Sequence, residues 1–498
     1  MTRRQLTITV SAVLAALVVG VVATVVATSG DDGNQSVNAP GGTTTPTTAP
    51  PVTTAPTTPT TTKPTTAPPT STTITPGTVV INPPVTTVAP TTRPPTTPPT
   101  TVAPTRPTTS TTRPTTTTSH GGGSPDVGIT PTEIRVAVIS DSPDAIAGTR
   151  AWAEWVNRRN GIAGRRIRVD TFDGPMDPTK YATAVKTACA QDFAIVGTFA
   201  TADDQTTELE RCGIPDLPAR TNSDAHAQAA NTFAAVPARA TSRLVGGYKW
   251  LLDHVPGCCA QYAILPTAPD QQAEAMRQVD AANSVGFTLT DTAELTDDAV
   301  QADYNPIVQA IVQKQANLAW SFLGYQSTVN LRKAALGKNV AGVKAWFCLD
   351  QCYTHEFLTA GGAAVNGEYV QIEVNPFEES RSIPAMASYL RYTKKDGATP
   401  TVTGEESFAA GMLFEQVARQ VVTDNGSDGL TRVALIAALH GVHTFTAGGI
   451  LGATDVAEGT PNGCFAVLQV RSKHFARIFP ATRATLSCGQ ENLLSTGR

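Results

Sequence analysis

Between Thr132 and Thr221, short runs rich in Val, Ile and Phe alternate with longer runs of helical periodicity. The runs RVAVIS (residues 135–140) and FAIVG (residues 193–197) are almost wholly apolar, as expected for parallel strands that are buried on both faces. This alternation predicts βαβ units and therefore an α/β fold on a parallel sheet. Ligands of such sheets bind outside the carboxyl ends of the strands, so we expect function there.

The same alternation is written a second time between residues 260 and 374. Apolar runs at 262–265, 318–322 and 344–347 are expected to be strands, separated by amphipathic helices. The flanking segments predict a helix over 241–254, a helix over 407–424 and a terminal hairpin built from 464–470 and 475–478. The chain is thus long enough, and patterned twice, for two α/β units.

The first 124 residues differ from the rest in composition. Residues 1–30 begin with Arg3 and Arg4, followed by an uncharged apolar run over 6–28. A membrane-spanning helix needs about 20 such residues, so a signal-anchor is expected, with its N-terminus in the cytoplasm. A cleaved signal peptide, which would leave the protein secreted, is the alternative. Residues 31–124 are dominated by Thr and Pro and are expected to form a disordered, extended linker. The ligand-binding region is expected over 125–498, outside the cytoplasmic membrane.

Several functional classes are disfavoured by the sequence. The formal net charge is -4 and no Lys/Arg-rich run occurs, so nucleic acid is not an expected partner. No P-loop, GxSxG or HExxH motif is present, and we expect neither catalysis nor a cofactor. His440 and His443 stand three residues apart without further ligands nearby, so no metal site is expected.

All eight cysteines lie after residue 188, an even number that indicates disulfides in an exported chain. The helices that end at Cys189 and Cys212 flank one strand, and neighbouring helices of a parallel unit end at the same edge of the sheet. A Cys189–Cys212 bridge is therefore expected. The remaining pairings stay open: Cys464 with Cys488 across the terminal hairpin, and Cys348 with Cys352 locally or each with Cys258 or Cys259.

Four segments, in their order along the chain, carry a resemblance to a known family. They are GITPTEIRVAVI, WVNRRNGIAGRRIRV, FAIVGTFAT and DYNPIVQAIVQKQANLAW. Together they resemble the leucine/isoleucine/valine-type (type 1) periplasmic substrate-binding proteins of ABC transporters, although Asn160 stands where the family has a Gly. The resemblance implies parallel sheets flanked by helices in two lobes, three crossovers and a ligand cleft between the lobes. It implies lobe one at about 125–245 plus 375–445, and lobe two at about 246–374 plus 446–498.

The resemblance also implies which residues of the first lobe hold the carboxylate of an amino-acid ligand. Thr201 lies in the loop after the third strand, and Ala219 and Thr221 lie in the Pro-Ala-x-Thr segment after the fourth. The two threonines can alternatively be plain helix N-caps. Arg220, between Ala219 and Thr221, either contacts an acidic ligand or points to solvent.

In the second lobe the resemblance implies that Tyr325 contacts the ligand and that Asp350 receives its ammonium group. Each has a structural alternative, since Tyr325 can be a core aromatic and Asp350 a turn residue. The loop over 266–272 departs from the family, because Gln271 stands near the position of an expected tyrosine. One aromatic wall of the cleft is therefore missing.

The expected function is extracytoplasmic binding of a small polar solute, an amino acid or a similar molecule, for delivery to an ABC permease. The alternative is a tethered sensory or cell-wall-associated receptor that uses the same cleft without transport. An extracellular α/β enzyme is the least favoured interpretation, because no nucleophile–base motif occurs.

Overall fold

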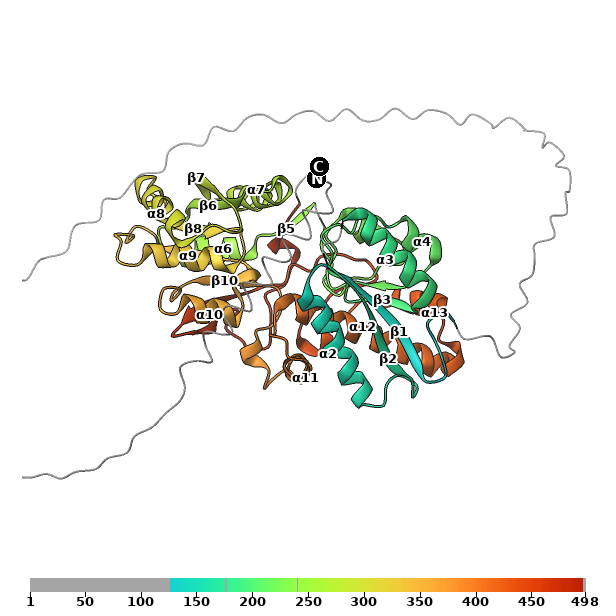
Figure 1. Cartoon of the computed structure of the whole chain (residues 1–498). Helices are drawn as coiled ribbons and strands as arrows, with labels where there is room; N and C mark the ends of the chain where they lie inside the picture. The colour runs from blue at the N-terminus through green and yellow to red at the C-terminus, as the bar shows by residue number, and fades with distance from the viewer. Residues whose placement is uncertain (1–125, 175–176, 240, 496–498) are drawn as a thin grey trace, which may run out of the picture. The chain divides into compact units, whose positions relative to one another are not determined.

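The structure is a computed structural model that describes residues 126–174, 177–239 and 241–495 (Figure 1). The expected anchor or signal segment, residues 1–30, and the expected linker, residues 31–124, lie outside the described residues. Among the helices of the described part of the chain, none combines the length and the apolar character needed to cross a membrane.

The first half of the described chain builds a parallel sheet with the strand order β2-β1-β3-β4. Its strands are β1 (Glu133–Ser140), β2 (Arg166–Asp173), β3 (Ala194–Val196) and β4 (Asp216–Leu217). The helices of this half are α2 (Pro143–Arg158), α3 (Pro178–Gln191), α4 (Thr207–Cys212) and α5 (Asp224–Gln228). Three later helices join them: α11 (Pro384–Lys395), α12 (Val402–Asn425) and α13 (Arg432–Leu439).

Strand β1 is buried on both faces because successive side chains point to opposite sides of the sheet. Val136 belongs to the cluster that includes α2 and α12, whereas Ala137 and Ile139 pack with α3 and α4. Figure 1 shows helices on both sides of this sheet. The prediction that the run over 135–140 forms a parallel strand buried on both faces is thus confirmed.

The second sheet has the order β12-β11-β10-β9-β8-β6-β7 and is parallel except where β11 and β12 join its edge. The strands are β6 (Ala260–Pro266), β7 (Thr288–Leu295), β8 (Leu318–Ser321), β9 (Ala345–Cys348), β10 (Tyr369–Ile372), β11 (Ala466–Arg471) and β12 (His474–Phe479). Its helices are α6 (Gly246–His254), α7 (Pro269–Ser284), α8 (Tyr304–Gln313), α9 (Tyr325–Ala335) and α10 (His355–Gly361). The α6 and α7 side chains pack on one face, and those of α8 and α9 on the other.

Within the described residues, the chain passes between the two sheets three times. It leaves the first sheet after β4, returns after β10 to form α11–α13, and crosses again before β11. The protein therefore has the two-lobed type 1 fold, with parallel sheets flanked by helices, that the sequence predicted.

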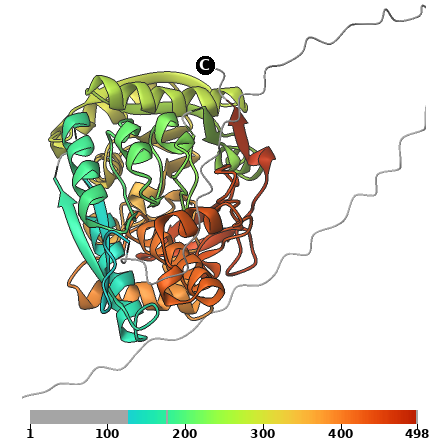
Figure 2. The ribbon, with the colours of Figure 1, turned by 90° about the vertical axis from the view of Figure 1, so that its right-hand side faces the viewer.

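Helix α12 returns from the C-terminal part of the chain to pack against α2, beside α11 (Figures 1 and 2). The approach is close because glycines replace side chains at the contact. A Cβ atom built on Gly148 would collide with the Gly404 carbonyl, and one on Gly411 would collide with the Trp152 ring. These positions bring the N-terminal end of α12 to the edge where β1 and β3 end.

Two predicted helices have different boundaries in the structure. The segment predicted as one helix over 241–254 begins as strand β5 (Ser242–Leu244), which pairs with β13 (Leu493–Ser495) near the other end of the chain. The helix predicted from residue 407 begins at Val402 instead, because the Thr401 side chain accepts a hydrogen bond from the Gly404 N–H and caps it. The sequence shows little hydrophobic periodicity at these two boundaries, because one depends on pairing with a distant strand and the other on a helix cap within a polar segment.

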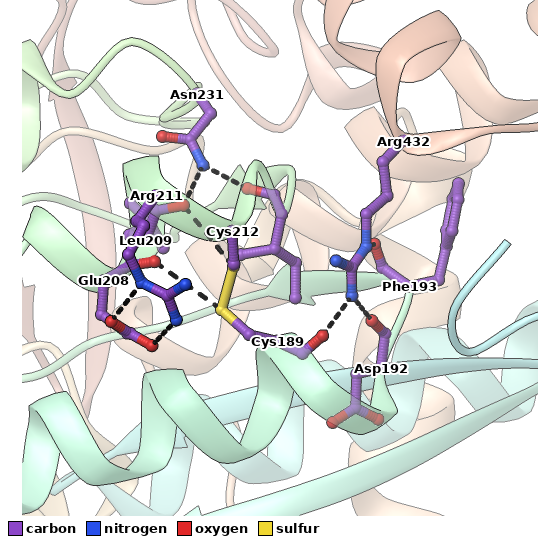
Figure 3. Close-up of a disulfide and its surroundings, with 10 residues drawn as sticks. Cys189, Asp192, Phe193, Glu208, Leu209, Arg211, Cys212, Asn231 and Arg432 are labelled. Carbon is purple, nitrogen blue, oxygen red and sulfur yellow. Dashed lines mark hydrogen bonds and ion pairs between the residues drawn. A yellow bond between two sulfur atoms is a disulfide. The ribbon is translucent and has the colours of Figure 1, made fainter.

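The described cysteines are all paired. Cys189, at the end of α3, is joined to Cys212, at the end of α4, as expected (Figure 3). Around this bond the Asn231 amide donates to the Leu209 carbonyl at 3.0 Å, and Arg432 donates to the Cys189 carbonyl at 2.9 Å. Cys348 pairs locally with Cys352, and Cys464 with Cys488, which are two of the alternatives that the sequence left open. Cys258 and Cys259 pair with each other and not with Cys348 or Cys352.

Candidate functional site

The predicted first-lobe residues lie in the loops that follow β3 and β4. Thr201 is exposed, and its N–H donates to the Asp141 carboxylate at 2.8 Å. Ala219 is fully buried, so only its backbone can contact a ligand. Thr221 is buried, and its hydroxyl donates to the Ala238 carbonyl at 2.9 Å. The Thr221 hydroxyl proton is therefore already used, although its oxygen can still accept a hydrogen bond.

Arg220, between Ala219 and Thr221, points into the protein and not into solvent. Its Nη2 lies 2.5 Å from Glu406 Oε1, on the first turns of α12, and its Nη1 lies 3.1 Å from Glu373 Oε1, just after β10. The Arg220 side chain is 18% exposed, that of Glu373 29% and that of Glu406 2%. Arg220 thus links the first-lobe loop to the crossover strand and to α12.

Asp350 lies on the short 3₁₀ turn η2 (Asp350–Cys352), which follows β9 of the second lobe after one residue, Leu349. The Cys348–Cys352 disulfide closes this turn, and the Gln351 amide donates to the Ser321 carbonyl at 3.3 Å. Burial raises the pKa of Asp350, the positive charge of Arg220 opposes the rise, and the negative charge of Glu373 adds to it. Asp350 therefore lies close enough to Arg220, in the loop that carries Ala219 and Thr221, for the guanidinium charge to affect the Asp350 pKa.

This group of four side chains, Arg220, Asp350, Glu373 and Glu406, is called the cleft cluster below. It contains one guanidinium and three carboxyl groups. The pKa of Glu406 is raised to about 7, first of all by burial; Arg220 opposes the rise, and the negative charges of Glu373 and Asp350 add to it. One cation does not balance three buried or half-buried carboxylates, so the cluster favours either a proton or an added cation.

Glu405, next to Glu406 on α12, is fully buried, and neither of its carboxyl oxygens has a hydrogen-bond partner among the described residues. Burial raises its pKa well above the usual range, and the negative charges of Glu406 and Glu378 add to this effect. A buried carboxyl without a partner is stable only in its neutral form. Burial therefore favours the neutral form of Glu405, which adds no negative charge to the cleft cluster.

Tyr325 is the first residue of α9 and is half-buried against the large hydrophobic cluster that includes Tyr353 and Phe357. Helix α9 packs against η2, so the Tyr325 helix borders the turn that carries Asp350. Gln271 is exposed in the first turn of α7. Contact of Tyr325 with a ligand stays a prediction, as do the ligand contacts of Thr201, Ala219, Thr221 and Asp350.

Two hollows on the described surface lie away from these residues. One, of about 410 Å³, is beside α3 and α4, and the other, of about 370 Å³, lies between α2, β2 and α11. Neither is lined by a member of the cleft cluster. We assign neither hollow a function.

Sequence reasoning missed Glu373 and Glu406. Glu373 carries one available signal, because a charged residue directly follows the apolar strand run over 369–372. Glu406 carries none, since it lies in the polar segment TGEES, which has no strong helical periodicity. Both are recognised only through their pairing with Arg220, which is 153 residues away in one case and 186 in the other.

Comparison with known proteins agrees with this architecture. The sequence model of the family described as "Periplasmic binding protein" matches residues 136–474, which is more than half of the chain. The chain belongs to the periplasmic binding protein family. This confirms the resemblance to the leucine/isoleucine/valine type, whose members are binding proteins with an extracytoplasmic ligand-binding domain. No curated protein matches the chain.

Solved structures with the same fold share little sequence identity with this chain. A branched-chain amino acid ABC transporter protein from Thermus thermophilus with bound valine is 14% identical, with a TM-score of 0.57 over 72% of this chain and 98% of that one. The isoleucine complex of a branched-chain amino acid transporter substrate-binding protein from Streptococcus pneumoniae is 12% identical, with a TM-score of 0.56 over 72% and 100%. A fatty acid ABC transporter substrate-binding protein from Thermomonospora curvata is 16% identical, with a TM-score of 0.55 over 73% and 98%. These different ligands show that the fold alone does not fix the solute.

Proposed function

We propose that this chain binds a small polar solute with a cationic group, an amino acid or a similar molecule, and delivers it to an ABC permease. Membership of the periplasmic binding protein family supports solute binding outside the cytoplasm. The single observation that carries the choice of ligand is the cleft cluster: the guanidinium of Arg220 pairs with Glu373 and Glu406, and its charge also acts on a third carboxyl group, that of Asp350. An ammonium group would supply the positive charge that this cluster lacks.

In this proposal the loop over 219–221 and Thr201 hold the carboxylate of the solute, and Asp350 receives its ammonium. Backbone N–H groups and hydroxyls suit an anion, while a buried ammonium needs a carboxylate partner. Tyr325 would lie beside the bound solute. The apolar segment over 6–28 would tether the protein to the membrane, and the linker over 31–124 would separate the binding region from it.

Thermal unfolding of the protein with individual amino acids, amides and short peptides tests the ligand class. A ligand at 100 times its Kd stabilises the folded state by about 2.7 kcal/mol. We expect amino acids to raise Tm and the matched carboxylic acids, which lack the ammonium, to have no effect. Equal shifts with both would exclude recognition of the cation, and the lack of any shift with amino acids would exclude that ligand class.

The role of Asp350 is tested by calorimetric titration of Asp350→Asn with the best solute. Loss of a charged hydrogen bond should weaken binding about tenfold to a hundredfold. The matched control is Asp280→Asn, an exposed aspartate on α7 of the same lobe, which should bind like the unmodified protein. Unchanged affinity in Asp350→Asn would remove Asp350 from the site.

Delivery to a permease is tested separately by uptake. Cells that lack this chain should accumulate the identified solute more slowly, and restoring the chain should restore the rate. Normal uptake in its absence would contradict transport and would favour the sensory receptor, with binding intact.

A further inference from the structure

His226 is fully buried between two aspartates in the first lobe. It lies on α5, where the Ser223 side chain accepts its N–H and caps the helix. Its ring Nδ1 lies 2.8 Å from Asp203 Oδ2, and its Nε2 lies 2.6 Å from Asp216 Oδ2. The two aspartates are themselves at most 1% exposed. A ring nitrogen therefore meets a buried carboxylate on each side.

When both aspartates are ionised, the carboxylate oxygens that face the ring can only accept, so both ring nitrogens must donate. Neutral imidazole has one N–H and protonated imidazole has two, and only the protonated form satisfies both contacts. The Tyr181 hydroxyl also lies near the ring, 3.5 Å from Nε2. Burial by itself would lower the pKa of His226, but the charges and hydrogen bonds of Asp216 and Asp203 outweigh it and raise the pKa to about 10.

The two aspartates belong to the segments that carry the proposed ligand edge. Asp203 lies two residues after Thr201, in the loop that follows β3, and the same Oδ2 accepts the Asn222 N–H at 2.7 Å. The Asn222 side chain donates to the Ala200 carbonyl at 2.8 Å. Asp216 lies on β4, and its Oδ2 also accepts the Thr232 hydroxyl at 2.9 Å. The network thus joins the loop after β3 to the chain immediately after Thr221.

We propose that His226, as a doubly hydrogen-bonded imidazolium between Asp203 and Asp216, is a positioning residue that fixes the loops after β3 and β4 at their mutual distance. It does not touch the ligand. It acts through Asp203, which holds the Asn222 backbone, and through Asp216, which holds β4. This proposal rests on the proposed function only in one respect, namely that these loops bind the ligand. The protonation state of the His226 ring and its effect on the loops do not depend on the proposed function.

The state of the ring is measured by NMR on the full chain labelled with ¹⁵N in histidine. The chain has seven histidines, so the ring spectrum is simple, and the His226 signals are identified by their loss in His226→Gln. At pH 8.0 we expect both His226 ring nitrogens to carry protons. A ring with one protonated nitrogen at that pH would overturn the proposal.

The effect on the loops is measured by hydrogen exchange of the Asn222 amide. His226→Gln leaves Asp203 and Asp216 without their shared cation, so exchange of this amide should become at least tenfold faster. The matched control is His443→Gln, because His443 is 58% exposed and paired with Asp455 at 3.1 Å on the surface. Equal exchange in His226→Gln and the unmodified protein would overturn the positioning role.

Two further comparisons keep the test decisive. If His226→Gln does not fold, Asp203→Asn, which keeps the ring and removes one charge, should show faster Asn222 exchange; unchanged exchange there overturns the proposal. Where a solute has been identified, its affinity should fall about tenfold in the variant that folds and stay unchanged in His443→Gln. If the protein binds no amino acid, the proposed function fails, but the NMR and exchange results still decide the role of His226.

Discussion

Replacing Arg220 by methionine should reveal the charge imbalance of the cleft cluster. The substitution keeps much of the aliphatic stem but leaves Glu406, whose side chain is 2% exposed, without its cation. Removing one partner of a buried ion pair costs about 3–5 kcal/mol. Because the Arg220 side chain is 18% exposed, we expect the lower end of that range, about 3 kcal/mol of unfolding free energy at pH 8.

The loss of unfolding free energy in Arg220→Met should depend on pH, and the pKa of Glu406 determines whether it grows or shrinks as pH rises. The folded-state pKa of Glu406 is about 7, above its ordinary value, so its favourable contribution is present at low pH and is lost as pH rises through 7. Arg220 limits this rise in pKa, and without it the folded state retains the Glu406 proton to still higher pH. At pH 5 the Glu406 carboxyl is protonated in either protein, so Arg220→Met should cost about 1 kcal/mol less there than at pH 8.

Urea unfolding at pH 5 and pH 8, followed by circular dichroism, measures both losses. Arg277→Met is the control, because Arg277 and its partner Glu274 are 49% and 46% exposed, and such pairs contribute below about 1 kcal/mol. Adding Glu406→Gln to Arg220→Met should recover most of the loss at pH 8. An equal loss at the two pH values, or no recovery in the double variant, would refute the electrostatic interpretation.

Three further predictions concern the frame that carries the site. Gly148→Ala places a methyl group against the backbone of α12 and should lower the unfolding free energy by about 1–3 kcal/mol, measured by urea unfolding. Burial, and then Asp170, raise the pKa of Asp192 to about 7, so the contribution of Asp192 to the folding stability is lost as pH rises through 7. Asp192→Asn should therefore reduce the difference in unfolding free energy between pH 5 and pH 8 by about 2 kcal/mol. Replacing Cys189 and Cys212 by serine opens a loop with a sequence separation of 23 and should cost about 3 kcal/mol, seen as a lower Tm in the absence of reducing agent.

The candidate site was predictable from the sequence only in part. The strand ends could be predicted because ligands of a parallel sheet bind after the carboxyl ends of its strands. Ala219 and Thr221 follow β4, and Asp350 follows β9. The orientation of the Arg220 side chain could not be predicted from the sequence. Whether it points to solvent or inward depends on Glu373 and Glu406, which come from a crossover and from a returning helix.

The sequence by itself determined the local elements and their order. Period-two and period-3.6 patterns are set by neighbours in the chain, so the βαβ units, and with them the Cys189–Cys212 bridge between adjacent helices, follow from nearby residues. The tertiary structure alone decided what depends on distant segments. It paired β5 with β13, placed α12 on α2, and paired the Arg220 guanidinium with Glu373 and Glu406. The physical reason is that burial and charge pairing depend on which segments meet in space, and a local pattern carries no record of those partners.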